Sequence, residues 1–126
     1  MPHVAPGEAL DRAFVDLAGL ADDLGPSPWR ACLVGTPGLR VVLLHWPGGH
    51  ATVPHLHPGA EEIFQVLRGR ARFTVGDEER LVGPGELVLA PRGVRHVIRV
   101  PDDAPVLLLA AVAPNEDRPD ETIEPA

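Results

Sequence analysis

The sequence predicts a small all-β protein, a barrel or sandwich of many short strands. Short apolar runs follow one another between residues 29 and 112. Gly and Pro, 13 and 15 of the 126 residues, separate these runs at regular intervals. Such punctuation is typical of antiparallel sandwiches and small barrels. The length favours a single domain over residues 1–126, large enough to bury one core.

The segment before the strands predicts one amphipathic helix at about residues 9–24, and the Gly25-Pro26 pair would end it. The apolar residues at helical spacing are Leu10, Phe14, Leu17, Leu20, Ala21 and Leu24. We expect this stripe to pack on the barrel or on a partner chain.

The predicted barrel covers about residues 29–112. Its strands are expected at 29–34, 39–46, 51–57, 62–67, 71–75, 80–82, 87–90, 94–100 and 106–112. Gly76-Asp77 favours a hairpin between two of them. Residues 113–126 are polar and rich in Pro, Asp and Glu, so we expect an extended arm or a disordered tail.

Charge and composition disfavour several functions and locations. The net charge is −7 and all 11 basic residues are arginines without a basic cluster, which disfavours nucleic-acid binding. We see no signal peptide and no apolar stretch long enough to span a membrane. Cys32 is the only cysteine, so no internal disulfide can form. These features predict a reducing, cytoplasmic location.

Three histidines and a glutamate are candidate metal ligands. His55 and His57 share one strand face because side chains alternate, and Glu62 opens the next predicted strand. His96 lies in a later strand among apolar residues. A lone histidine on such a face is more often a hydrogen-bonded core residue. Four such groups buried in one apolar barrel would be costly unless a cation neutralised them.

The spacing of these residues resembles the two motifs of the cupin superfamily. Gly49, five residues, His55-Leu56-His57, four residues, Glu62, six residues and Gly69 match the first motif without a gap. Gly85, five residues, Pro91-Arg92-Gly93, two residues and His96 match the second. The second motif usually ends in Asn, where this chain has Val100. That departure removes a polar side chain and no ligand.

The resemblance covers about residues 39–112. It implies a cupin jelly roll with one divalent transition metal held by His55, His57, Glu62 and His96. The metal would be Mn, Fe, Ni, Co, Cu or Zn, and the sequence does not choose among them. The neighbouring Glu61 competes for the carboxylate role, but only Glu62 keeps the motif spacing before Gly69.

Such a ligand set leaves about two coordination positions open on a six-coordinate ion. Ion and carboxylate together carry a charge of about +1, which suits a small anionic ligand such as an enolate or carboxylate. Candidate walls of the substrate pocket are Phe64, Val66, Phe73, Ile98 and Val100. The alternative is that these residues simply fill the core. No catalytic acid or base is identified.

Other polar residues have open roles. His45 or His50 could relay a proton, although surface or packing roles are the default for both. Five arginines are expected to be solvated, although one could recognise a substrate carboxylate. They are Arg68, Arg70, Arg72, Arg95 and Arg99.

The resemblance favours an oxygenase-type enzyme acting on a small aromatic, enol or carboxylate substrate. A non-catalytic ligand- or metal-sensing cupin, or a metal-dependent isomerase or decarboxylase, are the alternatives. The chain has no Tyr, which disfavours tyrosine-dependent sugar epimerases, and Cys32 lies outside the motifs. Thiol dioxygenases with three histidines and no carboxylate also fit poorly. Residues 39–46 and 62–67 are apolar on both faces, and the outward set, with Ile63 and Leu67, must lie under the helix, the tail or a second chain. We therefore expect a homodimer.

Overall fold

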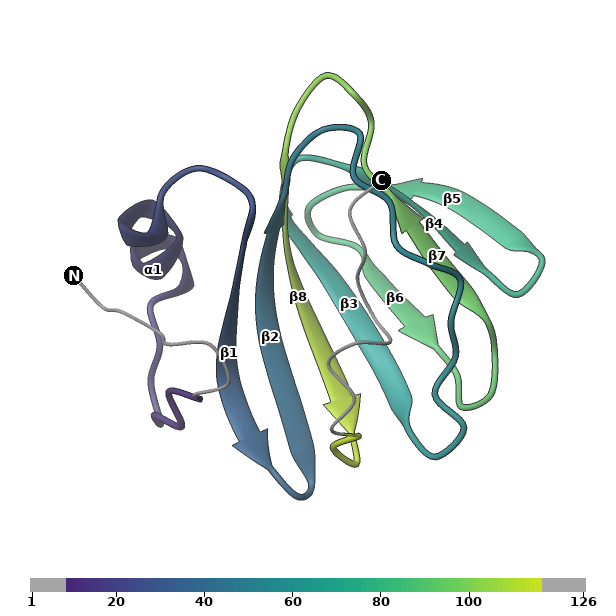
Figure 1. Cartoon of the computed structure of the whole chain (residues 1–126), viewed down its shortest axis with the longest axis horizontal. Helices are drawn as coiled ribbons and strands as arrows, with labels where there is room; N and C mark the ends of the chain where they lie inside the picture. Colours follow the sequence, from purple (N-terminus) through teal and green to yellow (C-terminus); the bar gives the residue numbers. More distant parts are fainter. Residues whose placement is uncertain (1–8, 117–126) are drawn as a thin grey trace.

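The computed structural model describes residues 9–116, and residues 1–8 and 117–126 lie outside the described part. The described chain forms one helix and eight strands (Figure 1). In chain order they are α1 (Leu17–Leu24), β1 (Trp29–Thr36), β2 (Leu39–Trp46), β3 (Glu61–Arg68), β4 (Ala71–Val75), β5 (Glu78–Val82), β6 (Leu87–Ala90), β7 (His96–Arg99) and β8 (Val106–Ala113). Among these residues, no helix is long and apolar enough to cross a membrane.

The strands form two antiparallel sheets. One sheet has five strands in the order β1-β2-β8-β3-β6, and the other has three in the order β5-β4-β7 (Figure 1). The main core lies between them and draws apolar side chains from both, among them Phe64 of β3, Phe73 of β4 and Ile98 of β7. The predicted all-β jelly roll is confirmed.

Strand alternation decides which residues face the core. On β3, Glu62, Phe64 and Val66 are buried whereas Glu61 and Ile63 are exposed, as expected for a strand with one interior face. This parity places the second glutamate of the pair, and not the first, inside the barrel.

The strand β2 is buried on both faces. Its even-numbered residues, from Arg40 to Trp46, lie on the same strand face, and Val42, Leu44 and Trp46 belong to the main core. Leu43 faces the other way, into a second cluster with Leu20 of α1 and Leu107 of β8. The sequence did not predict which face of β2 points into the barrel. The helix α1 covers one face, so the face that carries Val42 and Leu44 is the inner one. This covering element lies beside β1 in Figure 1.

The helix is shorter than predicted, because it begins at Leu17 and not near residue 9. Asp16 caps it, with its Oδ1 accepting a hydrogen bond of 3.1 Å from the Gly19 N–H. Residues before the cap instead bond to the edge strand β1, where the Leu10 N–H donates to the Cys32 carbonyl at 3.1 Å. Phe14, predicted on the apolar face, is 92% exposed. The helical spacing of residues 10–14 was therefore misleading, because the backbone N–H groups of Leu10 and Asp11 bond to the free edge of β1 instead.

The strand expected at residues 51–57 is also wrong. This segment makes only two isolated bridges, Ala51 to Arg99 and His55 to His96. Pro54 has no N–H to donate, so a continuous ladder cannot run through it. The segment stays extended and crosses beside β7, joining β2 to β3. Other strand boundaries differ by up to two residues from the prediction.

Turns and the start of the tail fix the ends of the barrel. Gly69 has φ +80°, and a Cβ there would collide with the Pro105 carbonyl oxygen, so this turn requires glycine. Asn115 holds the predicted tail to the β1–β2 turn, where its backbone N–H donates to the Pro37 carbonyl at 3.1 Å. Its side-chain amide donates to the Thr36 carbonyl at 2.9 Å. The remainder of the predicted tail lies outside the described residues.

Candidate metal centre

The four predicted metal ligands come together at one end of the core. Each offers a nitrogen or oxygen atom, and these atoms all lie within 4.8 Å of one another. His55 and His57 come from the extended segment, Glu62 from β3 and His96 from the start of β7. His57, Glu62 and His96 are buried, and His55 is half-buried. The site thus joins both sheets and the connection between them.

Backbone hydrogen bonds hold the histidine segments in place. The two N–H groups of His55 and His96 donate to each other's carbonyls at 3.2 and 2.9 Å. The Gly93 N–H donates to the His57 carbonyl at 2.9 Å, from a turn in which Gly93 has φ +75°. The glycine of the second motif therefore positions a ligand of the first motif.

The Nδ1 atom of each histidine makes a hydrogen bond to an oxygen atom outside the cluster. The contacts are His55 to the Val53 carbonyl at 2.9 Å, His96 to the Val94 carbonyl at 3.2 Å, and His57 to Glu116 Oε2 at 3.0 Å. Carbonyl and carboxylate oxygens only accept, so each Nδ1 must carry the hydrogen and donate it. In a neutral imidazole the Nε2 atom then has a free lone pair, which is the form that binds metals.

The contacts inside the cluster need a cation. His57 Nε2 and His96 Nε2 lie 3.0 and 3.1 Å from the same oxygen, Oε1 of Glu62. Two neutral rings with Nδ1–H would point lone pairs at a carboxylate oxygen, which is repulsive. Either extra protons or a metal ion must lie between these atoms. The donor set, three imidazole nitrogens and one carboxylate, fits a divalent transition metal.

The pKa shifts of the cluster residues without a metal ion also show that the site favours positive charge. Burial alone would raise the pKa of Glu62, but hydrogen bonds from His57 and His96 outweigh it and lower the pKa from 4.5 to about 2. The hydrogen bond to Glu62 raises the pKa of His57 above 6.5, against the opposing effect of burial. Burial lowers the pKa of His55. The cluster therefore keeps its carboxylate ionised and attracts a positive charge.

Glu116 is a site residue that the sequence did not reveal. Its Oε2 accepts from His57 Nδ1, and its Oε1 accepts from the Gly59 N–H at 2.8 Å. It comes from the polar tail, which composition predicted as an arm or a disordered segment. A buried metal-binding histidine needs an acceptor for its second nitrogen. Nothing in the spacing shows which of 18 acidic residues supplies it.

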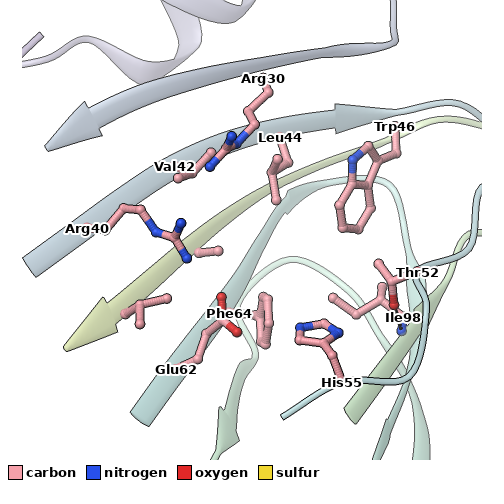
Figure 2. Close-up of a pocket in the computed structure, with 12 residues that line it drawn as sticks. Arg30, Arg40, Val42, Leu44, Trp46, Thr52, His55, Glu62, Phe64 and Ile98 are labelled. Carbon is pink, nitrogen blue, oxygen red and sulfur yellow. Dashed lines mark hydrogen bonds between the residues drawn. The ribbon is translucent and has the colours of Figure 1, made fainter. Parts of the chain in front are cut away.

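A pocket opens from the cluster into the barrel (Figure 2). It holds about 390 Å³ of empty space, including the part open to solvent. The lining residues are Arg30, Arg40, Val42, Leu44, Trp46, Thr52, His55, Glu62, Phe64, Ile98, Ala110 and Val112. His55 and Glu62 are thus the two cluster members that face this pocket.

The predicted pocket walls divide into two groups. Phe64 and Ile98 line the pocket, and the Phe64 ring also lies 5.7 Å from the His96 ring, centroid to centroid. Val66, Phe73 and Val100 are buried in the same core but do not line this pocket. For those three residues, the alternative of core filling fits the structure.

The arginines in the pocket are not those that the sequence singled out. Arg30 and Arg40 line it, from β1 and from the inner face of β2. The five expected arginines are all exposed and none lines this pocket. Parity could have revealed Arg40, which alternates with Val42 and Leu44, had the inner face of β2 been known.

His45 and His50 lie outside the cluster. The His45 ring faces away from the pocket and meets Trp29 edge to face, with 5.2 Å between ring centroids. His50 stacks on Trp46 with 4.6 Å between ring centroids. Burial lowers the pKa of both. Neither touches the metal ligands in the contacts of the described residues, which favours packing roles.

Comparison with known proteins finds similar sequences and folds. Residues 42–112 match a family model described as a cupin domain. An uncharacterised protein of Methanocaldococcus jannaschii, MJ1618, is 30% identical over 77 residues, which cover 61% of this chain and 62% of that protein. The match therefore spans less than two thirds of this curated relative.

Two solved structures are similar over most of the chain. TT1209 from Thermus thermophilus has a TM-score of 0.72 and 29% identity, covering 82% of this chain and 98% of the other. The DMSP lyase DddQ from Ruegeria pomeroyi has a TM-score of 0.63 and 31% identity. That match covers 71% of this chain and 48% of DddQ.

Proposed function

The chain belongs to the cupin domain family, and from this premise we propose that it is a metal-dependent enzyme acting on a small anion. One divalent transition metal would be held by His55, His57, Glu62 and His96. The metal would supply Lewis-acid or redox chemistry, and its identity among Mn, Fe, Ni, Co, Cu and Zn is open.

The observation that carries this proposal is the direction in which the cluster opens. Two of its four donors, His55 and Glu62, line the pocket, while His57 and His96 are 2% exposed and do not line it. A ligand in the pocket would therefore approach the open coordination positions from one side. Structural metal sites are normally closed, so an open side supports catalysis or ligand binding.

The pocket walls support chemistry in a dry environment. Val42, Leu44 and Phe64 line it and are buried. Such walls exclude water and strengthen electrostatic attraction between the site and an anion. In this proposal the histidines and Glu62 hold the ion, the apolar walls orient the ligand, and no separate proton-transfer residue is assigned.

An oxygenase-type reaction is the first candidate, because the resemblance to cupins with three histidines and one glutamate favours it. A lyase reaction is the second, because a protein 31% identical to this chain over the matched region is a DMSP lyase. A sensor that binds without turnover, or an isomerase or decarboxylase, would use the same site. The identity of the reaction rests on analogy of fold and is decided by experiment.

The test is turnover by protein loaded separately with iron, manganese, nickel or copper. An oxygen electrode would follow flavonols, catechols, diketones and small keto acids, and proton NMR of the same mixtures would detect products formed without oxygen. We expect substrate-dependent conversion that is lost in Glu62→Ala and His96→Ala and kept in Glu61→Ala. Glu61 is the exposed neighbour of Glu62 on β3, so this variant is a matched control. Binding without conversion across the panel would support the sensor instead.

We also propose that the protein is a homodimer in the cytoplasm. The second cluster, which contains Leu20 of α1, covers Leu67 and the outer face of β2. These residues therefore no longer indicate a dimer. Three apolar side chains of β3 and β6 stay exposed, however: Ile63 at 41%, Leu87 at 65% and Leu89 at 51%. A second copy that covers this face would explain them.

A further inference from the structure

Arg40 is a buried cation without a partner. It is 6% exposed, and its Nε atom is buried with no hydrogen-bond partner. Among the described residues no hydrogen bond or ion pair joins its guanidinium to another group. A buried charge left in this state is costly, and proteins rarely keep one unless it serves a ligand or a partner.

The side chain lies in the pocket of the metal cluster. Arg40 belongs to the inner face of β2, and Arg30, from β1, lines the same pocket near its rim. In Figure 2 the Arg40 guanidinium extends toward the interior of the pocket, where Glu62 and His55 lie on the opposite side. The charged lining residues are these two arginines and Glu62, in a chain whose net charge is −7.

We propose that Arg40 forms an anion subsite that binds a carboxylate of the substrate while the metal cluster binds its other end. The substrate class is thus a small bifunctional acid, with one carboxylate at Arg40 and oxygen donors at the metal. This assignment rests on the proposed function for the metal end only.

The chemistry of the lining favours a carboxylate. A guanidinium presents parallel N–H donors that match the two oxygens of a carboxylate. Between this subsite and Glu62 the walls are apolar, with Val42 and Phe64 among them. A ligand that spans the pocket therefore has two polar ends and a short carbon body. Phosphate and sulfate share the charge but lack that body.

The test uses the full-length protein and measures binding, not turnover. Calorimetry would compare malonate, succinate and glutarate with acetate, phosphate and sulfate, using metal-free and Zn²⁺-loaded protein. Trp46 lines the pocket, so its fluorescence in a Trp29→Phe background would follow weak binding to the metal-free form. The variants are Arg40→Met and, as a control, Arg99→Met, which removes the same charge from an exposed position on β7.

We expect Zn²⁺-loaded protein to bind a dicarboxylate more tightly than acetate. Arg40→Met should weaken the dicarboxylate by about tenfold or more, and Arg99→Met should leave it unchanged. In metal-free protein, dicarboxylate binding should also be lost in Arg40→Met. That arm tests the subsite even if the metal proposal fails.

Stability separates a binding role from a structural one. Replacing an unpartnered buried cation by an apolar side chain of similar length should keep or raise the melting temperature without ligand. A lower melting temperature for Arg40→Met with unchanged dicarboxylate binding would make Arg40 structural and overturn the inference. Phosphate or sulfate binding tighter than every dicarboxylate would overturn the assigned class. If Zn²⁺-loaded Arg40→Met binds the dicarboxylate as tightly as Zn²⁺-loaded wild type, the subsite is refuted and the proposed metal site is unaffected.

Discussion

Replacing Glu116 tests whether the tail tunes the metal centre. In Glu116→Ala, the His57 Nδ1–H loses an acceptor at 3.0 Å and the Gly59 N–H loses one at 2.8 Å. The His57 side chain is 2% exposed, so water cannot readily replace the lost acceptor. Leaving such a donor unsatisfied costs about 1–3 kcal/mol. Loss of an outer acceptor from a metal-binding histidine typically lowers metal affinity by about 10- to 100-fold, or about 1.4–2.7 kcal/mol.

The assay is competition for Zn²⁺ between the protein and a colorimetric chelator of known affinity. We expect Glu116→Ala to raise the dissociation constant by about one to two decades. Glu116→Gln should lie between this variant and wild type, because its amide oxygen can replace only one of the two accepting oxygens. Glu61→Gln, which removes the same charge from an exposed position on β3, should bind like wild type.

A second measurement reads the ring directly. In metal-free protein, nitrogen NMR of His57 should show a hydrogen on Nδ1 in wild type. In Glu116→Ala that hydrogen loses its acceptor, so Nδ1 should lose it and the ring should keep its hydrogen on Nε2, which lies 3.0 Å from Glu62 Oε1. The reasoning would be refuted by a dissociation constant for Glu116→Ala within about threefold of wild type, together with an unchanged tautomer. Glu116 would then be a surface contact with no influence on the ligand.

Four further outcomes are expected from the same geometry. Elemental analysis of untagged protein should find one bound metal ion in wild type and none in His57→Ala. Undiminished metal in the variant would contradict the ligand assignment. Chelation should lower the melting temperature by several degrees without unfolding the protein, because the β core is separate from the ion. In metal-free protein the pKa of Glu62 is about 2, against an ordinary 4.5. Its carboxylate therefore stabilises the fold above pH 4.5, and up to roughly 3 kcal/mol is lost as the pH falls from 4.5 to 2. Urea unfolding at a series of pH values should show this loss in wild type and not in Glu62→Gln. Light scattering should give a dimer mass for wild type. Replacing Leu87 and Leu89 by charged residues should give the monomer mass of 13.4 kDa. A monomeric wild type would refute the dimer.

The sequence by itself predicted the fold class and the four clustered residues. Turn residues and apolar alternation act locally, so they predicted most of the strands, and β3 parity placed Glu62 inward and Glu61 outward. The convergence of His55, His57 and His96 followed from the resemblance to the two cupin motifs, because His55 and His96 meet only when the extended segment pairs with β7. Turns and strand parity are features that a short stretch of chain encodes without reference to the rest.

Local patterns failed where a distant segment competes for the same groups. The helical spacing at residues 10–14 is real, but the free edge of β1 takes the backbone hydrogen bonds of Leu10 and Asp11 instead. The extended run at 51–57 had strand composition, yet Pro54 prevents a continuous ladder with β7.

The tertiary structure alone decided the chemistry around the cluster. Glu116 reaches His57 across 59 residues of sequence, and no spacing rule encodes such a contact. Arg40 faces the pocket because α1 covers the opposite face of β2, and a strand that is apolar on both faces carries no signal of which side is inside. Burial is a property of the whole packed molecule, so the second carboxylate and the unpartnered cation could be recognised only once the sheets and the helix were in place.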